Sequence, residues 1–204
     1  MSTASPNPVI ERILDAADHL FYREGIQAVG VDALAAAASV SKRTLYKHFA
    51  SKDALIVAYL LRRAARMTAL DGPPLQQILG VFEGLERVLG GRSFRGCPYV
   101  NAVAELGGDP AHPAVAVVKD IKLGRRDWFE SRLRALNATD PARLADQIAL
   151  LVDGAITTSM VRGGDPQAAV SAREAALVLL RSAGVQAAAS TPRTVKRTTS
   201  TSTT

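Results

Sequence analysis

Side chains suited to binding an anionic polymer gather between residues 42 and 52, a stretch with no acid between Asp32 and Asp53. Lysine and arginine neutralise phosphates and hydrogen-bond guanine edges, and hydroxyl groups bond to bases or phosphates. The net charge of +6 also favours a polyanionic partner. The cluster therefore indicates nucleic-acid binding, although its composition alone is also consistent with a solvated helical face. Its candidate residues are Lys42, Arg43, Thr44, Tyr46, Lys47, His48 and Lys52.

Cys97 is the second chemically distinctive residue, and it is the only cysteine. It precedes Pro98 and follows Arg92 and Arg95, a setting that favours the thiolate, so a redox switch is one interpretation and a small buried hydrophobe is the other. A nucleophile and base pair of Cys97 with His112 would make the protein an enzyme. No acid that would orient the histidine is evident, so we expect no enzyme. Three separated histidines and one cysteine also predict no metal site and no cofactor.

Apolar residues recur at helical spacing along most of the chain, and no segment alternates with the period of a strand. This pattern predicts an all-α fold of about nine helices. Prolines and caps at Asn7–Pro8, Ser51 and Asp140–Pro141 mark several helix starts. We expect helices at about 8–24, 31–38, 42–49, 52–68, 74–90, 98–107, 112–136, 141–161 and 167–183.

The two short helices at 31–38 and 42–49 are predicted to form a helix-turn-helix. Such a motif needs a small residue where the helices cross, a turn between them and apolar inner faces. The residues that meet these needs are Leu34, Ala35, Ser39, Val40, Leu45 and Phe49. The polar residues of the second helix then face outward, where a major groove would accept them. We accordingly predict a DNA-binding domain at 1–55, a larger second domain at 56–186, whose regulatory role is implied by the resemblance described below, and a disordered basic Ser/Thr-rich tail at 187–204.

Three stretches carry a resemblance to a known family: VDALA at 31–35, VSKRTLYKHF at 40–49 and SKDAL at 51–55. Together they resemble the DNA-binding signature of TetR (tetracycline-repressor) family transcriptional regulators, over roughly residues 9–60. The resemblance implies a homodimer on double-stranded operator DNA, with residues 42–44 starting the recognition helix. It also implies contacts of Tyr46 and Lys47 to phosphate or base edges, and of Lys52 to phosphate. Two positions depart from the family: Ser39 stands where glycine is common, and Gly30-Val31 where Ser or Thr begins the second helix.

Residues 95–183 resemble the regulatory domain of a TetR subgroup, through RGCPYVNAVAE at 95–105 and LLVDGA at 150–155. The resemblance implies a small-molecule effector bound between helices. The candidate ligand-binding residues are Cys97, Tyr99, Asn101, Glu105 and Trp128. Asn101 and Glu105 are equally consistent with satisfying helix termini, and Trp128 with core packing.

The same resemblance implies dimerisation through the last two helices. Apolar stripes on both helices fit this role, and Gly154 and Thr158 would allow close approach of a second helix. The predicted interface residues are Leu144, Ile148, Leu151, Ala155, Ala176 and Leu180. The stripes are also consistent with an ordinary core within one chain.

These observations predict a sequence-specific DNA-binding regulator, a repressor that a small-molecule effector of unknown identity releases from a palindromic operator. An activator remains open, because the sequence does not encode where the protein sits relative to a promoter. A non-specific DNA-binding protein is the main alternative, since the tail carries Arg193, Lys196 and Arg197 without an acid. The N-terminus lacks the basic start and long apolar stretch of a signal peptide, which predicts a cytoplasmic protein.

Overall fold

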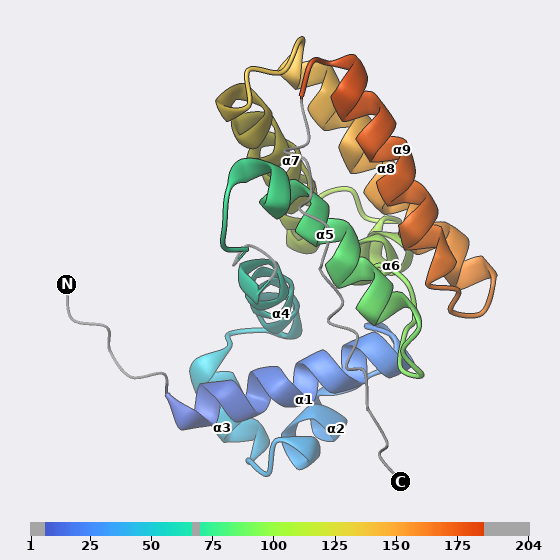
Figure 1. Cartoon of the computed structure of the whole chain (residues 1–204). Coiled ribbons are helices and arrows are strands. Elements are labelled where there is room, and N and C mark those ends of the chain that lie inside the picture. The colour runs from blue at the N-terminus through green and yellow to red at the C-terminus, as the bar shows by residue number, and fades with distance from the viewer. Residues whose placement is uncertain (1–6, 67–69, 186–204) are drawn as a thin grey trace, which may run out of the picture.

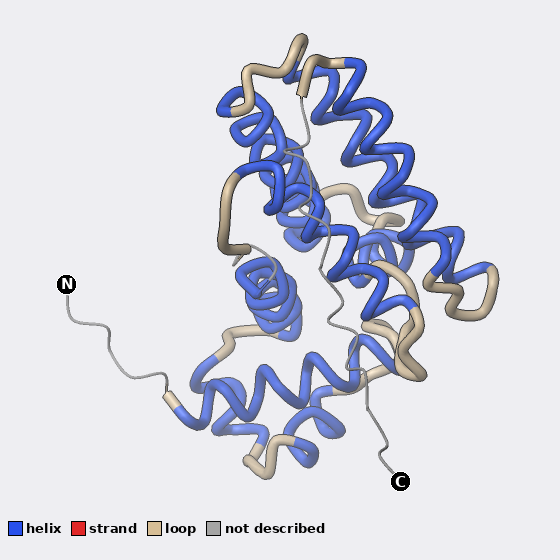
Figure 2. Tube along the Cα trace, in the orientation of Figure 1, coloured by secondary structure: helices blue, strands red, loops and turns tan. Residues whose placement is uncertain are grey.

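Over residues 7–66 and 70–185, which the computed structural model describes, the protein consists of nine α-helices without a strand (Figures 1 and 2). They are α1 (Pro8–Glu24), α2 (Val31–Ala37), α3 (Lys42–His48), α4 (Lys52–Arg66), α5 (Pro74–Leu89), α6 (Pro98–Leu106), α7 (Pro113–Ala135), α8 (Pro141–Val161) and α9 (Gln167–Ser182). The predicted all-α fold is confirmed, and the predicted helix bounds differ from these by about two residues or fewer. The predicted tail at 187–204, with its three cations, lies outside the described residues.

The N-terminal unit contains α1, α2 and α3, with α2 and α3 beneath α1 in Figure 1. Asn7 caps α1 by accepting a hydrogen bond from the Val9 amide at 3.0 Å, and the buried face of α1 carries Ile13, Ala17 and Phe21. Between α2 and α3 the chain turns at Ser39, whose φ of 53° lies in the left-handed region. Serine thus adopts the conformation for which glycine is favoured, so this departure from the family pattern leaves the turn intact.

The larger unit contains α5 to α9, with α8 and α9 side by side along one edge (Figure 1). α7 packs against α8, and α5 packs against α9. Helices α5 to α8 each begin at a proline, whose fixed φ suits the first helical turn. Phe82, Phe129 and Ile148 are almost completely buried between these helices.

Helix α4 connects the two units, because it packs against α1 on one side and α7 on the other. It runs without a break through residues 55 and 56, between which the sequence placed a domain boundary. The position of the helix-turn-helix is therefore set partly by contacts that α4 makes with the larger unit.

Helix α8 is, among the described residues, the one helix long and apolar enough to cross a membrane by length and composition, with a mean hydropathy of 1.3. Its residues Leu144, Ile148 and Val152 are buried against neighbouring helices. A core helix of a bundle has the same composition, so this finding is weak support for a membrane span.

Candidate nucleic-acid interface

Helix α3 is held to α2 by its apolar side and exposes its polar side. Ser41 caps α3, since its Oγ accepts a hydrogen bond from the Thr44 amide at 3.0 Å. Leu45 is completely buried, whereas the side chain of Tyr46 is 48% exposed and that of Lys47 is also exposed. Leu45 therefore occupies the inner face of α3, and Tyr46 is turned outward, as the sequence predicts.

The three residues predicted to read bases differ in their surroundings. Lys42 Nζ lies 2.6 Å from Asp32 Oδ1 on α2. The Thr44 hydroxyl lies 2.9 Å from Ser41 Oγ, so it takes part in the helix cap. Arg43 is exposed, and no described hydrogen bond or ion pair engages its guanidinium. Arg43 is thus the member of this group whose head group is available to a base edge.

The start of α4 adds further polar groups beside α3. Ser51 Oγ accepts a hydrogen bond from the Ala54 amide at 3.0 Å, which confirms its capping position, and Lys52 follows it with a half-buried side chain. Gly30 precedes α2 without a side-chain cap, as its lack of a hydroxyl dictates. His48 is also half-buried, at the last turn of α3.

Ion pairs that the sequence reasoning missed join α4 to α1. Arg62 lies 3.1 Å from Glu11 and 2.8 Å from Asp15, and Arg63 pairs with Asp18. Three acids at positions 11, 15 and 18 share one face of α1. This helical spacing in the sequence could have predicted an acidic face that pairs with cations of another helix. The pairs are partly buried, so they make α1 and α4 move together.

Tyr22 and Tyr59 complete this contact between α1 and α4. The Arg63 guanidinium carbon lies 4.4 Å from the centre of the Tyr22 ring and 5.5 Å from that of Tyr59. Burial raises the pKa of the Tyr59 hydroxyl well above its ordinary value. Both rings therefore pack around one guanidinium.

The five predicted ligand-binding residues do not share one cavity among the described pockets. Asn101 Nδ2 donates to the Arg95 carbonyl at 2.9 Å, and Glu105 Oε2 accepts from the Gln27 amide at 2.9 Å. Both contacts are internal to the chain, and each satisfies a main-chain atom of a loop. A ligand-binding role for the two side chains stays a prediction.

The other three candidates lie in or against the core. Tyr99 is buried, and desolvation raises the pKa of its hydroxyl to about 12, with Arg125 5.9 Å from the ring centre. Trp128 packs its ring edge-on to Phe129 and lies under Arg132, whose guanidinium carbon is 4.3 Å from the Trp128 ring centre. Cys97 is buried at the start of α6. Their ligand-binding role stays a prediction.

His112 does not serve as a base for Cys97 in this arrangement. Its Nδ1 accepts a hydrogen bond from the Ala114 amide at 3.1 Å, which caps α7, and its Nε2 lies 3.4 Å from Asp53 Oδ1 at the start of α4. Both ring nitrogens are therefore directed at groups other than the thiol. Within the described residues, no group of three or more His, Cys, Asp or Glu side chains is placed to hold a metal ion.

The predicted dimer residues lie mostly inside one chain. Leu144, Ile148, Ala176 and Leu180 are each at most 4% exposed, so they have almost no surface to offer a second copy. Their stripes pack α8 against α9 and α7. This packing is consistent with a core within one chain, the alternative that the sequence left open, and a place for these four residues in a dimer interface stays a prediction.

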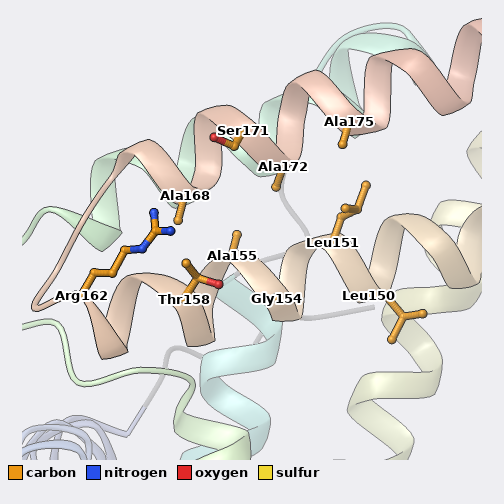
Figure 3. A pocket seen from close by; sticks show the side chains of 10 residues that line it. All are labelled: Leu150, Leu151, Gly154, Ala155, Thr158, Arg162, Ala168, Ser171, Ala172 and Ala175. Carbon is orange, nitrogen blue, oxygen red and sulfur yellow. The ribbon is translucent and has the colours of Figure 1, made fainter.

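Beside them, α8 and α9 form an open groove of about 320 Å³ (Figure 3). Its walls include Leu151 and Ala155, the remaining two predicted residues. Leu150 also lines the groove and is 71% exposed, and Val161 and Val178 of the same helices are 78% and 55% exposed. A contiguous face of exposed apolar and small residues is the usual mark of a protein interface. The full lining is Leu150, Leu151, Gly154, Ala155, Thr158, Arg162, Ala168, Ser171, Ala172 and Ala175.

Comparison with known proteins agrees with this geometry. Residues 13–59 match the family model for bacterial regulatory proteins of the tetR family. The chain is 38% identical to a putative TetR transcriptional regulator from Streptomyces avermitilis, whose crystal structure superposes with a TM-score of 0.75 over 88% of this chain and 100% of that one.

Two curated relatives match a shorter part of the chain. An uncharacterized HTH-type transcriptional regulator of Mycobacterium tuberculosis is 39% identical over 79 residues, or 39% of this chain and 38% of the relative. The HTH-type transcriptional regulator UidR of Escherichia coli is 37% identical over 71 residues, or 35% of this chain and 36% of UidR. The chain thus matches well under two thirds of the length of either, whereas its similarity to the Streptomyces protein covers 88% of this chain and so extends through the larger unit. The chain belongs to the TetR family, which consists of transcriptional regulators and not of enzymes.

Proposed function

We propose that the protein is a sequence-specific DNA-binding repressor that acts as a homodimer on a palindromic operator. The observation that supports this most directly is α3 itself. Its apolar side is buried on α2 while Arg43, Tyr46 and Lys47 face outward. A recognition helix needs this division between an inner apolar face and an outer hydrogen-bonding face. Tyr46, Lys47, His48 and Lys52 are proposed as contacts to phosphate or base edges, and Lys42, Arg43 and Thr44 as candidates for base reading.

The proposed dimer forms through the groove and the exposed apolar face of α8 and α9. Gly154, Ser171 and Ala175 are small and at least partly exposed, so helices of a second copy can approach closely there. A two-fold axis at this face would relate two copies of α3 and give the operator two related half-sites. Each recognition helix contacts only a short half-site, so a single contact is weak. A dimer that binds two half-sites at once gains affinity through avidity.

Selection of bound DNA from a random pool tests this proposal. We expect a palindromic consensus whose half-sites are about one helical turn apart or a multiple of it. A non-specific DNA-binding protein would enrich no consensus, and that result would contradict the proposal. Measuring transcription from a promoter that carries the selected site, with and without the protein, separates a repressor from an activator.

Regulation by a small, largely apolar effector is the second half of the proposal. Tyr99 and Trp128 lie where α6 and α7 meet the core, with Arg125 and Arg132 over their rings. Aromatic walls with a few polar groups are suited to an apolar ligand. The effector must prefer the arrangement that does not fit the operator, and operator DNA must then weaken effector binding by the same factor. Titrating an identified ligand with and without operator tests this, and equal affinities would refute it.

We further infer that the protein belongs to the subgroup marked by RGCPYVNAVAE and acts in the cytoplasm. The segment forms the end of the α5–α6 loop and nearly all of α6, so the motif coincides with one structural unit. Fractionation of cells that express the protein tests the location, and recovery in the membrane fraction would contradict it.

A further inference from the structure

We propose that two hydrogen-bonded contacts between the N-terminal unit and the loop and helix at residues 95–105 set the half-site spacing that the dimer recognises. We call them the domain clasp: Tyr22 with Arg95 and Gly96, and Gln27 with Glu105. The inference rests on the proposed function, because spacing has meaning only for a dimer on two half-sites. It assigns Tyr22 and Glu105 as positioning residues for DNA recognition.

The Tyr22 part of the clasp uses both hydrogen-bonding capacities of one hydroxyl. Tyr22 Oη donates to the Gly96 carbonyl at 3.0 Å and accepts from the Arg95 amide at 2.9 Å. Donor and acceptor directions of a phenol are nearly fixed once its ring is fixed. The ring is held by Arg63, which is paired with Asp18. The end of α1 is therefore located relative to the loop before α6.

The Gln27 part of the clasp joins the α1–α2 loop to the last turn of α6. The backbone amide of Gln27 donates to Glu105 Oε2 at 2.9 Å, and the side-chain Nε2 of Gln27 donates to the backbone carbonyl of Glu105. A hydrogen bond to a carboxylate is stronger than one between neutral groups. Gly25 has a φ of 98°, and a Cβ there would lie 3.1 Å from Glu105 Oε2. The positive φ favours glycine here, and a side chain would also require the Glu105 carboxylate to shift slightly.

The other side of the loop is fixed to the larger unit. Asn101 Nδ2 donates to the Arg95 carbonyl at 2.9 Å. Gly96 has a φ of 85°, and a Cβ on it would clash with Met160 Sδ of α8. Since α8 carries the proposed dimer face, Met160, Gly96 and Tyr22 form a short series of contacts from that face to α1. The series fixes α1, and with it α3, relative to the two-fold axis.

The clasp is separate from the α4 contacts that also hold the two units together. α4 packs along α7, and Asp53 faces His112 at 3.4 Å. These contacts persist when clasp hydrogen bonds are removed, so we expect clasp variants to fold and to dimerise. What they lose is a defined orientation of the N-terminal unit, which then samples several separations between the two recognition helices.

The experiment compares operators that share the selected half-sites but differ by one or two base pairs in the spacing between them. Wild-type protein is expected to bind one spacing best. Tyr22→Phe and Glu105→Ala are expected to bind that operator roughly two- to tenfold more weakly, because each loses hydrogen bonds of modest net strength. They should also discriminate less between the best spacing and its neighbours. Glu105→Gln keeps an acceptor for the Gln27 amide and should retain most of the wild-type profile.

Tyr59→Phe is the matched control, because it removes a buried hydroxyl of the same α1–α4 contact outside the clasp. Sedimentation and thermal unfolding establish that each variant is folded and dimeric. An unchanged spacing profile in folded Tyr22→Phe and Glu105→Ala would overturn the clasp proposal while leaving the proposed function intact. A wild-type protein without any preferred operator would overturn both.

Discussion

Lys42 stands at the first position of α3, where the helix end carries partial positive charge and a cation is unfavourable. Asp32 on α2 offsets this with its carboxylate at 2.6 Å from Lys42 Nζ. The side chains remain 55% and 79% exposed, so the pair is weak and can open when DNA arrives. At the scale of single residues, Asp32 therefore restrains a cation on the DNA-facing side, and Arg43 beside it is not restrained in this way.

Asp32→Asn is expected to strengthen binding to random DNA more than binding to the operator. Removing the carboxylate frees Lys42 for phosphate and removes a repulsive charge, so the salt dependence should steepen by about one phosphate contact. Fluorescence anisotropy across a salt series measures both quantities. Asp120→Asn on α7 changes the net charge equally and should leave the slope unaltered; equal slopes for the two variants would contradict the prediction.

Arg43→Ala is expected to change which base is preferred at one position of each half-site. An arginine that bonds a base edge contributes about 1–3 kcal/mol of discrimination, so substitution should relax the preference at that position. Repeating the selection from a random pool with the variant measures this.

Lys52→Ala is the comparison for Arg43→Ala, because Lys52 is proposed to contact phosphate. The substitution should weaken binding to all DNA sequences similarly. It should also lower the salt dependence of the affinity by about one phosphate contact. A uniform loss of affinity for Arg43→Ala, without altered base preference, would reassign Arg43 to the DNA backbone.

At the scale of elements, α8 and α9 each present two different faces. Leu144, Ile148, Ala176 and Leu180 pack the helices within the chain. The groove, which the exposed Leu150 also lines, is the face proposed for a second copy. A charge at Ala155 would disturb both faces, since Ala155 is only 4% exposed in the single chain. Leu150 is the better place to separate dimerisation from folding.

Leu150→Arg is expected to yield folded monomers with greatly reduced operator affinity. Placing a guanidinium in an apolar interface leaves an unpaired charge there, whereas in the monomer the same group is solvated. Sedimentation velocity gives the oligomeric state, and circular dichroism the helix content. Leu123→Arg on α7 introduces the same side chain at a leucine that is 49% exposed, and it should stay dimeric. A Leu150→Arg protein that is dimeric with full operator affinity would refute dimerisation through the groove of α8 and α9.

At the scale of the whole molecule, two units share α4, and the domain clasp joins the end of α1 and the α1–α2 loop to residues 95–105. The N-terminal unit is therefore joined to the larger unit at more than one place. The C-terminal segment at 187–204 carries three cations and no acid. It lies outside the described residues.

Deletion of residues 187–204 is expected to lower affinity for random DNA and to reduce the salt slope by up to about three contacts, one for each of Arg193, Lys196 and Arg197. Operator affinity should fall less, so the ratio of operator to random binding should rise. Parallel titrations of full-length and shortened protein measure the ratio. Loss of operator preference on deletion would favour the non-specific alternative, because preference would then depend on the tail and not on α3.

The helices, their starts at prolines and capping residues, and the helix-turn-helix with its outward Tyr46 were predicted from the sequence. These features depend on side-chain periodicity and on hydrogen bonds between near neighbours, such as that of the Thr44 amide to Ser41, which local sequence contains. The family followed from the same local segments, and the comparisons confirm it.

Only the tertiary structure decided which partners the polar residues of α6 have and which stripes of α8 and α9 are internal. Tyr22 and Gly96 are 74 residues apart in sequence, and Gln27 and Glu105 are 78 apart. No periodicity relates such positions, since their contact depends on how α4 packs between α1 and α7. An apolar stripe likewise predicts burial but not whether the covering helix comes from the same chain. The packing of α8 against α7 and α9 decides this, because it buries Leu144 and Ile148 inside the chain and leaves Leu150 exposed.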